Sequence, residues 1–139
     1  MTRALAMAAC ISALIAATNA HAQSVPREAA GRCQYPDAAK DYAAETTFIA
    51  CDGVAVEDKG QGVVLNFLRK GWGQSDRFYG QVHGGDIRIS RVALRKAEAR
   101  DAQGTCRLTY RTDGRLSVAS CLVKSRARWI AANFVASGF

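Results

Sequence analysis

Hydrophobic and polar residues alternate along most of the chain, which is the pattern of half-buried β-strands. The runs at 46–57 and 62–70 both follow it, and the segment DKGQ between them has the composition of a turn. Side chains two residues apart lie on the same face of a strand, so Val63, Leu65 and Phe67 share one face. We therefore predict that these two runs pair as an antiparallel hairpin.

A second hairpin is predicted from the run at 77–95, because Gly84 and Gly85 lie at its middle and favour a tight turn. The apolar face changes phase in the second half of this run. A single extra residue near Ser90 or Arg91 would reconcile the two faces, and such bulges help small sheets curl toward closure.

The remaining segments complete the expected topology. Residues 36–45 are alanine-rich and begin with proline, which predicts a short helix. The charged segment 96–104 is expected to form a loop or a helical turn, and 125–139 fits neither period but is expected to be a final strand. With strands at turn spacings of 8 to 12 residues and no βαβ alternation, the fold class is all-β. We expect a small antiparallel meander barrel or sandwich of six to eight strands with one short N-terminal helix.

The segment CRLTYRTDGRLSVASC, residues 106–121, predicts a third hairpin with a cysteine at each outer end. A two-residue turn at Asp113 and Gly114 would place Cys106 directly opposite Cys121. In that register Leu108 and Tyr110 face the core, whereas Leu116 lies on the outer face with the arginines.

The first 22 residues, MTRALAMAACISALIAATNAHA, have one arginine, an apolar run and a small-residue site, which predicts a secretory signal peptide cleaved after Ala22. An alternative is lipoprotein processing at Cys10. The apolar run is too short to span a bilayer and no later segment is apolar enough, so no transmembrane segment is expected. We predict a flexible tail at 23–32, a single disulfide-linked domain at 33–139, and a periplasmic or secreted location.

Four cysteines remain after the signal peptide, and an oxidising compartment favours two disulfides. The opposed pair leaves Cys33 with Cys51 by elimination, although the other two connectivities stay open. The chain has no CxxC pair and no zinc-ligand spacing, and its only histidine beyond the signal peptide is His83. We therefore expect no metal and no cofactor.

The charge of the chain is strongly asymmetric. Residues 23–66 carry 4 basic and 7 acidic side chains, whereas residues 67–139 carry 14 basic and 5 acidic ones. This asymmetry predicts a basic face that attracts anionic partners. The candidate anion-binding residues are Arg69, Lys70, Arg88, Arg91, Arg107, Arg111, Arg126 and Arg128.

An anionic component of the cell envelope, such as lipid phosphate, is the partner expected first, with peripheral membrane contact. Nucleic acid is not expected as a partner, because the signal peptide directs the chain away from it. Trp72 and Trp129 would suit stacking or interfacial contact, but we expect both in the core.

Enzymatic chemistry is not expected. His83 lies beside the Gly-Gly turn with Asp86 opposite, but a histidine at a hairpin tip is more often a surface residue. The disulfides leave no free thiol, and the chain has neither a nucleophile elbow nor a phosphate-binding loop. We therefore name no catalytic residue and expect a binding protein.

Two alternatives to the basic face remain open. The segment TTFIACDG resembles the start of small periplasmic lysozyme inhibitors, a likeness that covers about eight residues. The resemblance implies a disulfide-bearing β-barrel that binds a protein partner. The other alternative is a small ligand carried inside a barrel, although bulky inward side chains predict a filled interior.

Overall fold

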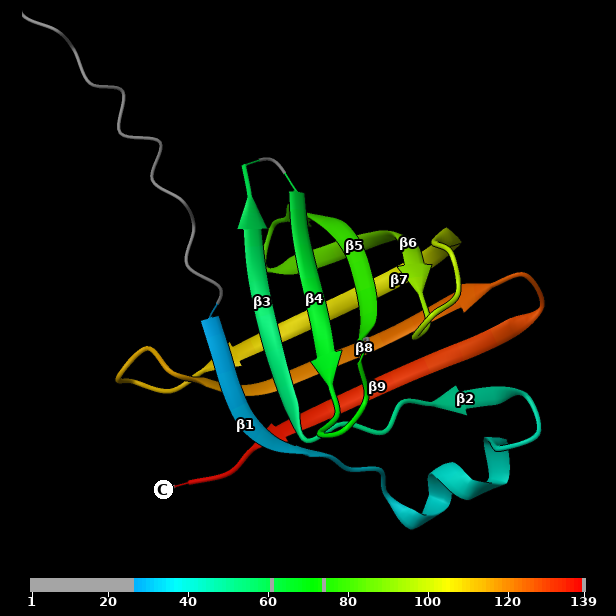
Figure 1. Cartoon of the computed structure of the whole chain (residues 1–139), viewed down its shortest axis with the longest axis horizontal. Coiled ribbons are helices and arrows are strands. Elements are labelled where there is room, and N and C mark those ends of the chain that lie inside the picture. Colours follow the sequence, from blue (N-terminus) through cyan, green and yellow to red (C-terminus); the bar gives the residue numbers. More distant parts are fainter. Residues whose placement is uncertain (1–26, 61, 74, 139) are drawn as a thin grey trace, which may run out of the picture.

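The structure is a computed structural model that describes residues 27–60, 62–73 and 75–138. It confirms the all-β fold class: eight antiparallel strands form a closed barrel, and β2 is an extra strand on its outside (Figure 1). The strands are β1 (Arg27–Cys33), β2 (Thr46–Phe48), β3 (Gly53–Lys59), β4 (Gly62–Leu68), β5 (Asp76–His83), β6 (Asp86–Ala93), β7 (Arg100–Tyr110), β8 (Leu116–Ser125) and β9 (Arg128–Ala136). Within these described ranges, no helix is long and apolar enough to cross a membrane.

Strand β1 closes the barrel. It pairs with β3 from Arg27 to Ala30 and with β9 from Gly31 to Cys33. The expected flexible tail is therefore wrong for residues 27–32, while the signal peptide and residues 23–26 lie outside the described residues. At the closure, a Cβ on Gly31 would overlap the carbonyl oxygen of Val135, so this backbone approach requires glycine.

The hydrophobic core lies inside the barrel and is formed by the inward-facing side chains of its strands. Val63, Leu65 and Phe67 all face inward, at 6%, 0% and 1% exposure, which confirms the predicted face and the β3–β4 hairpin. Phe67 packs edge-on against Phe78, with ring centroids 5.3 Å apart. The bulge is also confirmed, because in the β5–β6 ladder Tyr79 pairs with Arg91 but Gly80 pairs with Ile89, which leaves Ser90 as the extra residue.

The cysteine hairpin forms as predicted at its ends but not at its turn. Cys106 lies opposite Cys121 and is bonded to it, with Cα atoms 4.0 Å apart. The turn is a three-residue loop, since Arg111 and Arg115 flank it and Gly114 alone adopts a positive φ, of 85°. This loop changes the register by one residue.

A bulge in β8 corrects that change. The register shifts between Thr109 and Tyr110, and the extra residue Ser117 donates its hydroxyl to the Thr109 carbonyl at 2.9 Å. The bulge turns Leu116 inward, where it is buried, and leaves Tyr110 43% exposed. The predicted outer face of Leu116 is therefore wrong, whereas Tyr110 keeps the predicted inner face, opposite Leu116, but is not fully buried there.

Three other predicted elements differ from the structure. The run at 46–57 is divided into β2 and β3, because Ile49 and Cys51 turn into the core between them. The expected helix is a single 3₁₀ segment, η1 (Asp37–Tyr42), with no buried residue to stabilise a longer one. The segment at 96–104 is a strand from Arg100 onward, because Ala102 is buried in the barrel. The final strand is confirmed as β9.

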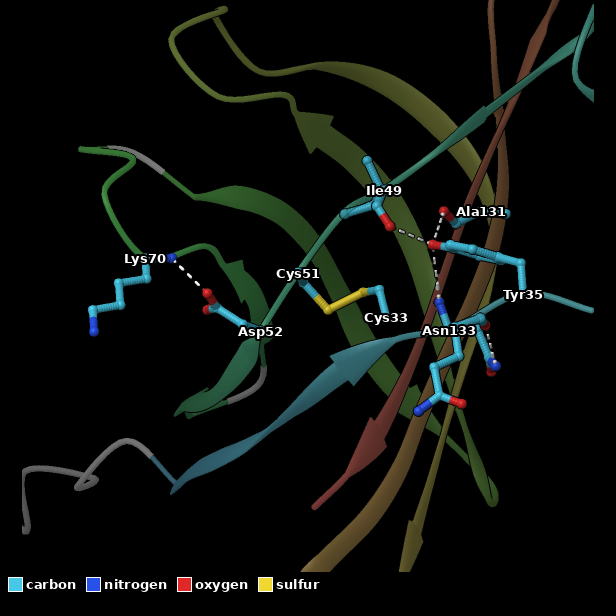
Figure 2. The surroundings of a disulfide bond; sticks show 9 residues. Cys33, Tyr35, Ile49, Cys51, Asp52, Lys70, Ala131 and Asn133 are labelled. Atoms are coloured by element: carbon cyan, nitrogen blue, oxygen red, sulfur yellow. Dashed lines mark hydrogen bonds between the residues drawn. A yellow bond between two sulfur atoms is a disulfide. The ribbon is translucent and has the colours of Figure 1, made fainter.

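The segment between β1 and β3 forms a lobe tied down at both ends. Cys33 is bonded to Cys51, which confirms the preferred pairing (Figure 2). Beside this bond the Tyr35 hydroxyl lies 2.6 Å from the Ile49 carbonyl oxygen and 3.0 Å from that of Ala131. Burial raises the pKa of Tyr35 to about 12, so the hydroxyl stays protonated to a higher pH than that of an exposed tyrosine.

Candidate functional site

The barrel has two ends with different loops. The basic end carries the loops after β4 and β6 and the tight turn after β8, and the hairpin end carries the turns after β3, β5 and β7. The structure separates the eight predicted anion-binding residues. Arg69, Lys70, Arg126 and Arg128 lie at the basic end, Arg88, Arg91 and Arg107 on strands of the wall, and Arg111 at the hairpin end.

Several of these side chains already have partners in the protein. Arg107 forms an ion pair with Asp86 at 2.9 Å, and the Arg107 side chain lowers the pKa of that carboxyl. Arg111 donates to the Gly138 carbonyl at 2.9 Å, and Arg128 donates to the Thr47 hydroxyl at 2.8 Å. The predicted residues therefore do not form one continuous anion-binding face.

The basic end contains a stack of guanidinium groups on an indole ring. The Arg69 guanidinium carbon lies 4.6 Å from the ring centroid of Trp72, and that of Arg95 lies 3.8 Å from it. Trp72 is half-exposed, and Trp129 is 36% exposed beside Lys124, so the predicted core positions of both tryptophans are wrong. These are cation–π contacts, which restrict the arginine side chains without neutralising them.

Buried Asp76 determines where Arg95 lies. Arg95 has a φ of 50°, a left-handed conformation that is strained for any residue with a side chain. Its N–H donates to Asp76 Oδ1 at 2.9 Å, and its carbonyl accepts a hydrogen bond from Arg77 at 3.4 Å. The start of β5 thus fixes the loop after β6 that brings Arg95 onto Trp72.

The loop after β4 is fixed at its start as well. The backbone N–H of Lys70 donates to an oxygen of Asp52 at 2.8 Å (Figure 2). Arg69 also lines a small cavity of about 300 Å³ with Arg32, beside the Cys33–Cys51 disulfide. Both loops that carry the stack are therefore attached to the barrel.

The guanidinium groups of Arg69 and Arg95 have no hydrogen-bond or ion-pair partner among the described residues. In the same part of the chain, the buried Nε of Arg77 also lacks a hydrogen-bond acceptor. Guanidinium N–H groups held in a plane match the oxygens of a carboxylate or phosphate. This end of the barrel therefore presents unused donors suited to an anion.

Sequence reasoning identified Arg69 and Lys70 but missed Arg95 and Arg77. Arg95 is the last residue of the run at 77–95, which was expected to form the second hairpin. The only indication in the sequence is Asp76, an acid at the start of an apolar strand, whose partner cannot be recognised without the fold.

The acid–base pair considered from sequence does not form a site. His83 and Asp86 are ladder partners at the hairpin end, but the Asp86 carboxylate accepts from Arg107. Within the described ranges, no three His, Cys, Asp or Glu side chains gather in a way that would hold a metal ion.

Comparisons with known proteins gave no match to any family model, curated protein or solved structure.

Proposed function

We propose that this protein is a non-enzymatic periplasmic or secreted protein that binds anionic groups of the cell envelope, such as lipid phosphates, at the basic end of its barrel. The observation that carries the proposal is the pair of guanidinium groups, Arg69 and Arg95, stacked on Trp72 without an anionic partner among the described residues. Because the stack already restricts both side chains, an incoming anion has less conformational entropy to remove.

The local charge supports an anionic ligand. Two acids of this end form hydrogen bonds with the backbone rather than ion pairs with the stacked guanidinium groups, since buried Asp76 accepts from the Arg95 N–H and Asp52 accepts from the Lys70 N–H. The basic side chains of this end include Arg32, Arg69, Lys70, Arg77, Arg95, Lys96, Arg126 and Arg128. Juxtaposed cations of this kind attract anionic surfaces at about 1 kcal/mol each near the surface.

Envelope location is proposed from the signal sequence together with the disulfides. Both bonds form within one small domain, and such bonds persist in oxidising compartments. A half-exposed tryptophan beside arginines is suited to a peripheral position at the lipid headgroups.

Binding to vesicles tests this proposal. The protein is expected to co-sediment with phosphatidylglycerol vesicles at low salt and not with phosphatidylcholine vesicles, and binding should weaken as salt rises. The double variant Arg69→Gln with Arg95→Gly should reduce binding at least tenfold, since glycine also accepts the left-handed conformation at position 95.

The matched control is Arg88→Gln with Arg91→Gln, which removes the same charge from the barrel wall. This control should change vesicle binding less than twofold. Equal losses in the two double variants, or no binding to phosphatidylglycerol at low salt, would overturn the proposal. Competition by inorganic phosphate distinguishes recognition of a free phosphate from recognition of a lipid surface.

A further inference from the structure

The hairpin end of the barrel contains an apolar cavity that the core does not fill. Its volume is about 650 Å³, and its apolar lining comprises Val56, Val63, Val82, Ile87, Leu108 and Tyr110. Val82 is 63% exposed and Tyr110 is 43% exposed at this end. Such exposure is unusual for large apolar side chains at inward-facing positions of a strand. The expected filled interior therefore applies near Phe67 and Phe78, but not here.

Three charged side chains line the same cavity: Arg27, Asp58 and Asp86. Asp86 is paired with Arg107, and Asp58 also has an interaction partner. The Arg27 side chain forms no hydrogen bond or ion pair with the residues that the structure describes. Arg27 is therefore the charged group of this lining whose side chain is still open to a ligand's head group.

A second cavity of about 440 Å³ adjoins the first along β1. The two share Arg27, Val56 and Tyr110, so Arg27 lies where they meet. Arg115 also lines the second cavity, but it is paired with Asp113 at 2.8 Å. A ligand whose charged group contacts Arg27 thus has apolar space beside it.

We propose that the hairpin end is a second binding site, which takes a single-chain amphipathic anion with its apolar chain in the cavity and its head group on Arg27. The volume lies within the range of about 300–1,000 Å³ that is usual for small-molecule sites, and barrel mouths are a common place for them. A guanidinium can hold such a head group through two parallel N–H donors. This site is at the opposite end from Arg69 and Arg95, so the two proposals fail or succeed independently.

Calorimetric titration with dodecanoate, below its micelle concentration, tests this site. Saturable binding with one molecule per chain is expected, at least tenfold tighter than binding of dodecyltrimethylammonium, which has the same chain and the opposite charge. Absence of saturable dodecanoate binding, or equal affinity for the two probes, would overturn the proposal.

Substitutions of lining residues test whether dodecanoate binds in this cavity. Arg27→Gln should weaken dodecanoate binding at least tenfold, and Val82→Glu should do the same because it adds a negative charge at an exposed position of the lining. Arg88→Gln is the control, since it removes the same charge from an exposed position of β6 that does not line the cavity. Circular dichroism checks that each variant is folded.

Two results would show that dodecanoate does not bind at the hairpin end. Equal weakening by Arg27→Gln and Arg88→Gln would mean that only net charge matters. Loss of dodecanoate binding in the Arg69→Gln, Arg95→Gly variant, with Arg27→Gln unaffected, would place the ligand at the basic end. Either result contradicts the proposal.

Discussion

The carboxylate of Asp76 accepts a hydrogen bond of 2.9 Å from the backbone N–H of Arg95, and this bond connects the start of β5 to the loop after β6. Asp76 is only 5% exposed, so its polar group is bonded within the protein as buried groups usually are. The bond fixes Arg95 in its left-handed conformation, which places the guanidinium over Trp72.

The first prediction concerns the pH dependence of stability. Burial raises the pKa of Asp76, more than the Arg95 N–H and the nearby guanidinium groups lower it. The folded state therefore binds this proton more tightly than the unfolded state. The contribution of Asp76 to stability is then full below its ordinary pKa of 3.8 and is lost as pH rises through the raised value.

Urea unfolding of the wild type and Asp76→Asn across pH 3–7 measures this effect. The stability of the wild type relative to the variant should fall as pH rises above about 4. Asp86 and Asp113, whose pKa values are lowered by hydrogen bonds from Arg107 and Arg115, give the opposite slope, but they do so in both proteins. A difference that stays constant with pH would contradict the prediction.

A second prediction is that Arg126→Gly stabilises the protein. Arg126 has a φ of 57° in the two-residue turn between β8 and β9, where glycine avoids the steric cost of a side chain. The gain in the free energy of unfolding should be up to about 1 kcal/mol. Arg88→Gly, within a strand, is the control and should lose about 0.5–1 kcal/mol. Lower stability of Arg126→Gly than of wild type would contradict this reasoning.

The two disulfides should differ in their access to reductant. Cys106 and Cys121 are 0% and 3% exposed inside the barrel, whereas Cys33 is half-buried and lines a surface cavity with Cys51. Mild reduction of the folded protein followed by alkylation should therefore label Cys33 and Cys51 first. Peptide mass mapping identifies the labelled pair, and earlier labelling of Cys106 would refute the expectation.

Each disulfide should also contribute to stability. Both close loops of similar length, with sequence separations of 18 and 15 residues, so chain-entropy estimates give roughly 3 kcal/mol for either one. Full reduction in denaturant adds about 4 Da, two hydrogens for each bond. Urea unfolding of the Cys→Ser pair variants measures the individual losses, and an unchanged midpoint would argue against the estimate.

Gly31→Ala should disrupt the closure of the barrel. A methyl group there would overlap the Val135 carbonyl, so β1 and β9 must move apart. We expect a loss of about 1–3 kcal/mol or more, as for other overpacked sites. Gly73→Ala is the matched control, because the space around a Cβ at that position is open. Equal thermal midpoints for the two variants would contradict the close approach.

The cysteine hairpin shows how far the pattern could predict the fold. The opposed cysteines were predicted correctly although the turn was wrong, because the three-residue loop at Gly114 and the bulge at Ser117 shift the register in opposite directions. Bulges depend on contacts across the barrel, so Leu116 could not be assigned to the core from the local sequence.

Two strand segments were missed because their inward side chains are small. Strand β1 turns Ala29, Gly31 and Cys33 toward the interior, and the first part of β7 buries only Ala102. Small residues give only a weak alternation of hydrophobic and polar positions in the sequence. Closure of the barrel nevertheless requires them where two strands approach closely, as at Gly31. The candidate site was missed in part for a related reason, since the contact between Arg95 and Trp72 depends on a backbone conformation that no local pattern indicates.

The pairing of β1 with β9 also has a consequence for the order of events during folding. One edge of β1 can pair with β3 early, but its other edge waits for a partner about a hundred residues later in the chain. A chain in which β9 is not yet in place therefore displays an unsatisfied strand edge, and exposed edges of this kind promote aggregation. Completion of the barrel accordingly waits for β9, in whichever compartment the chain folds.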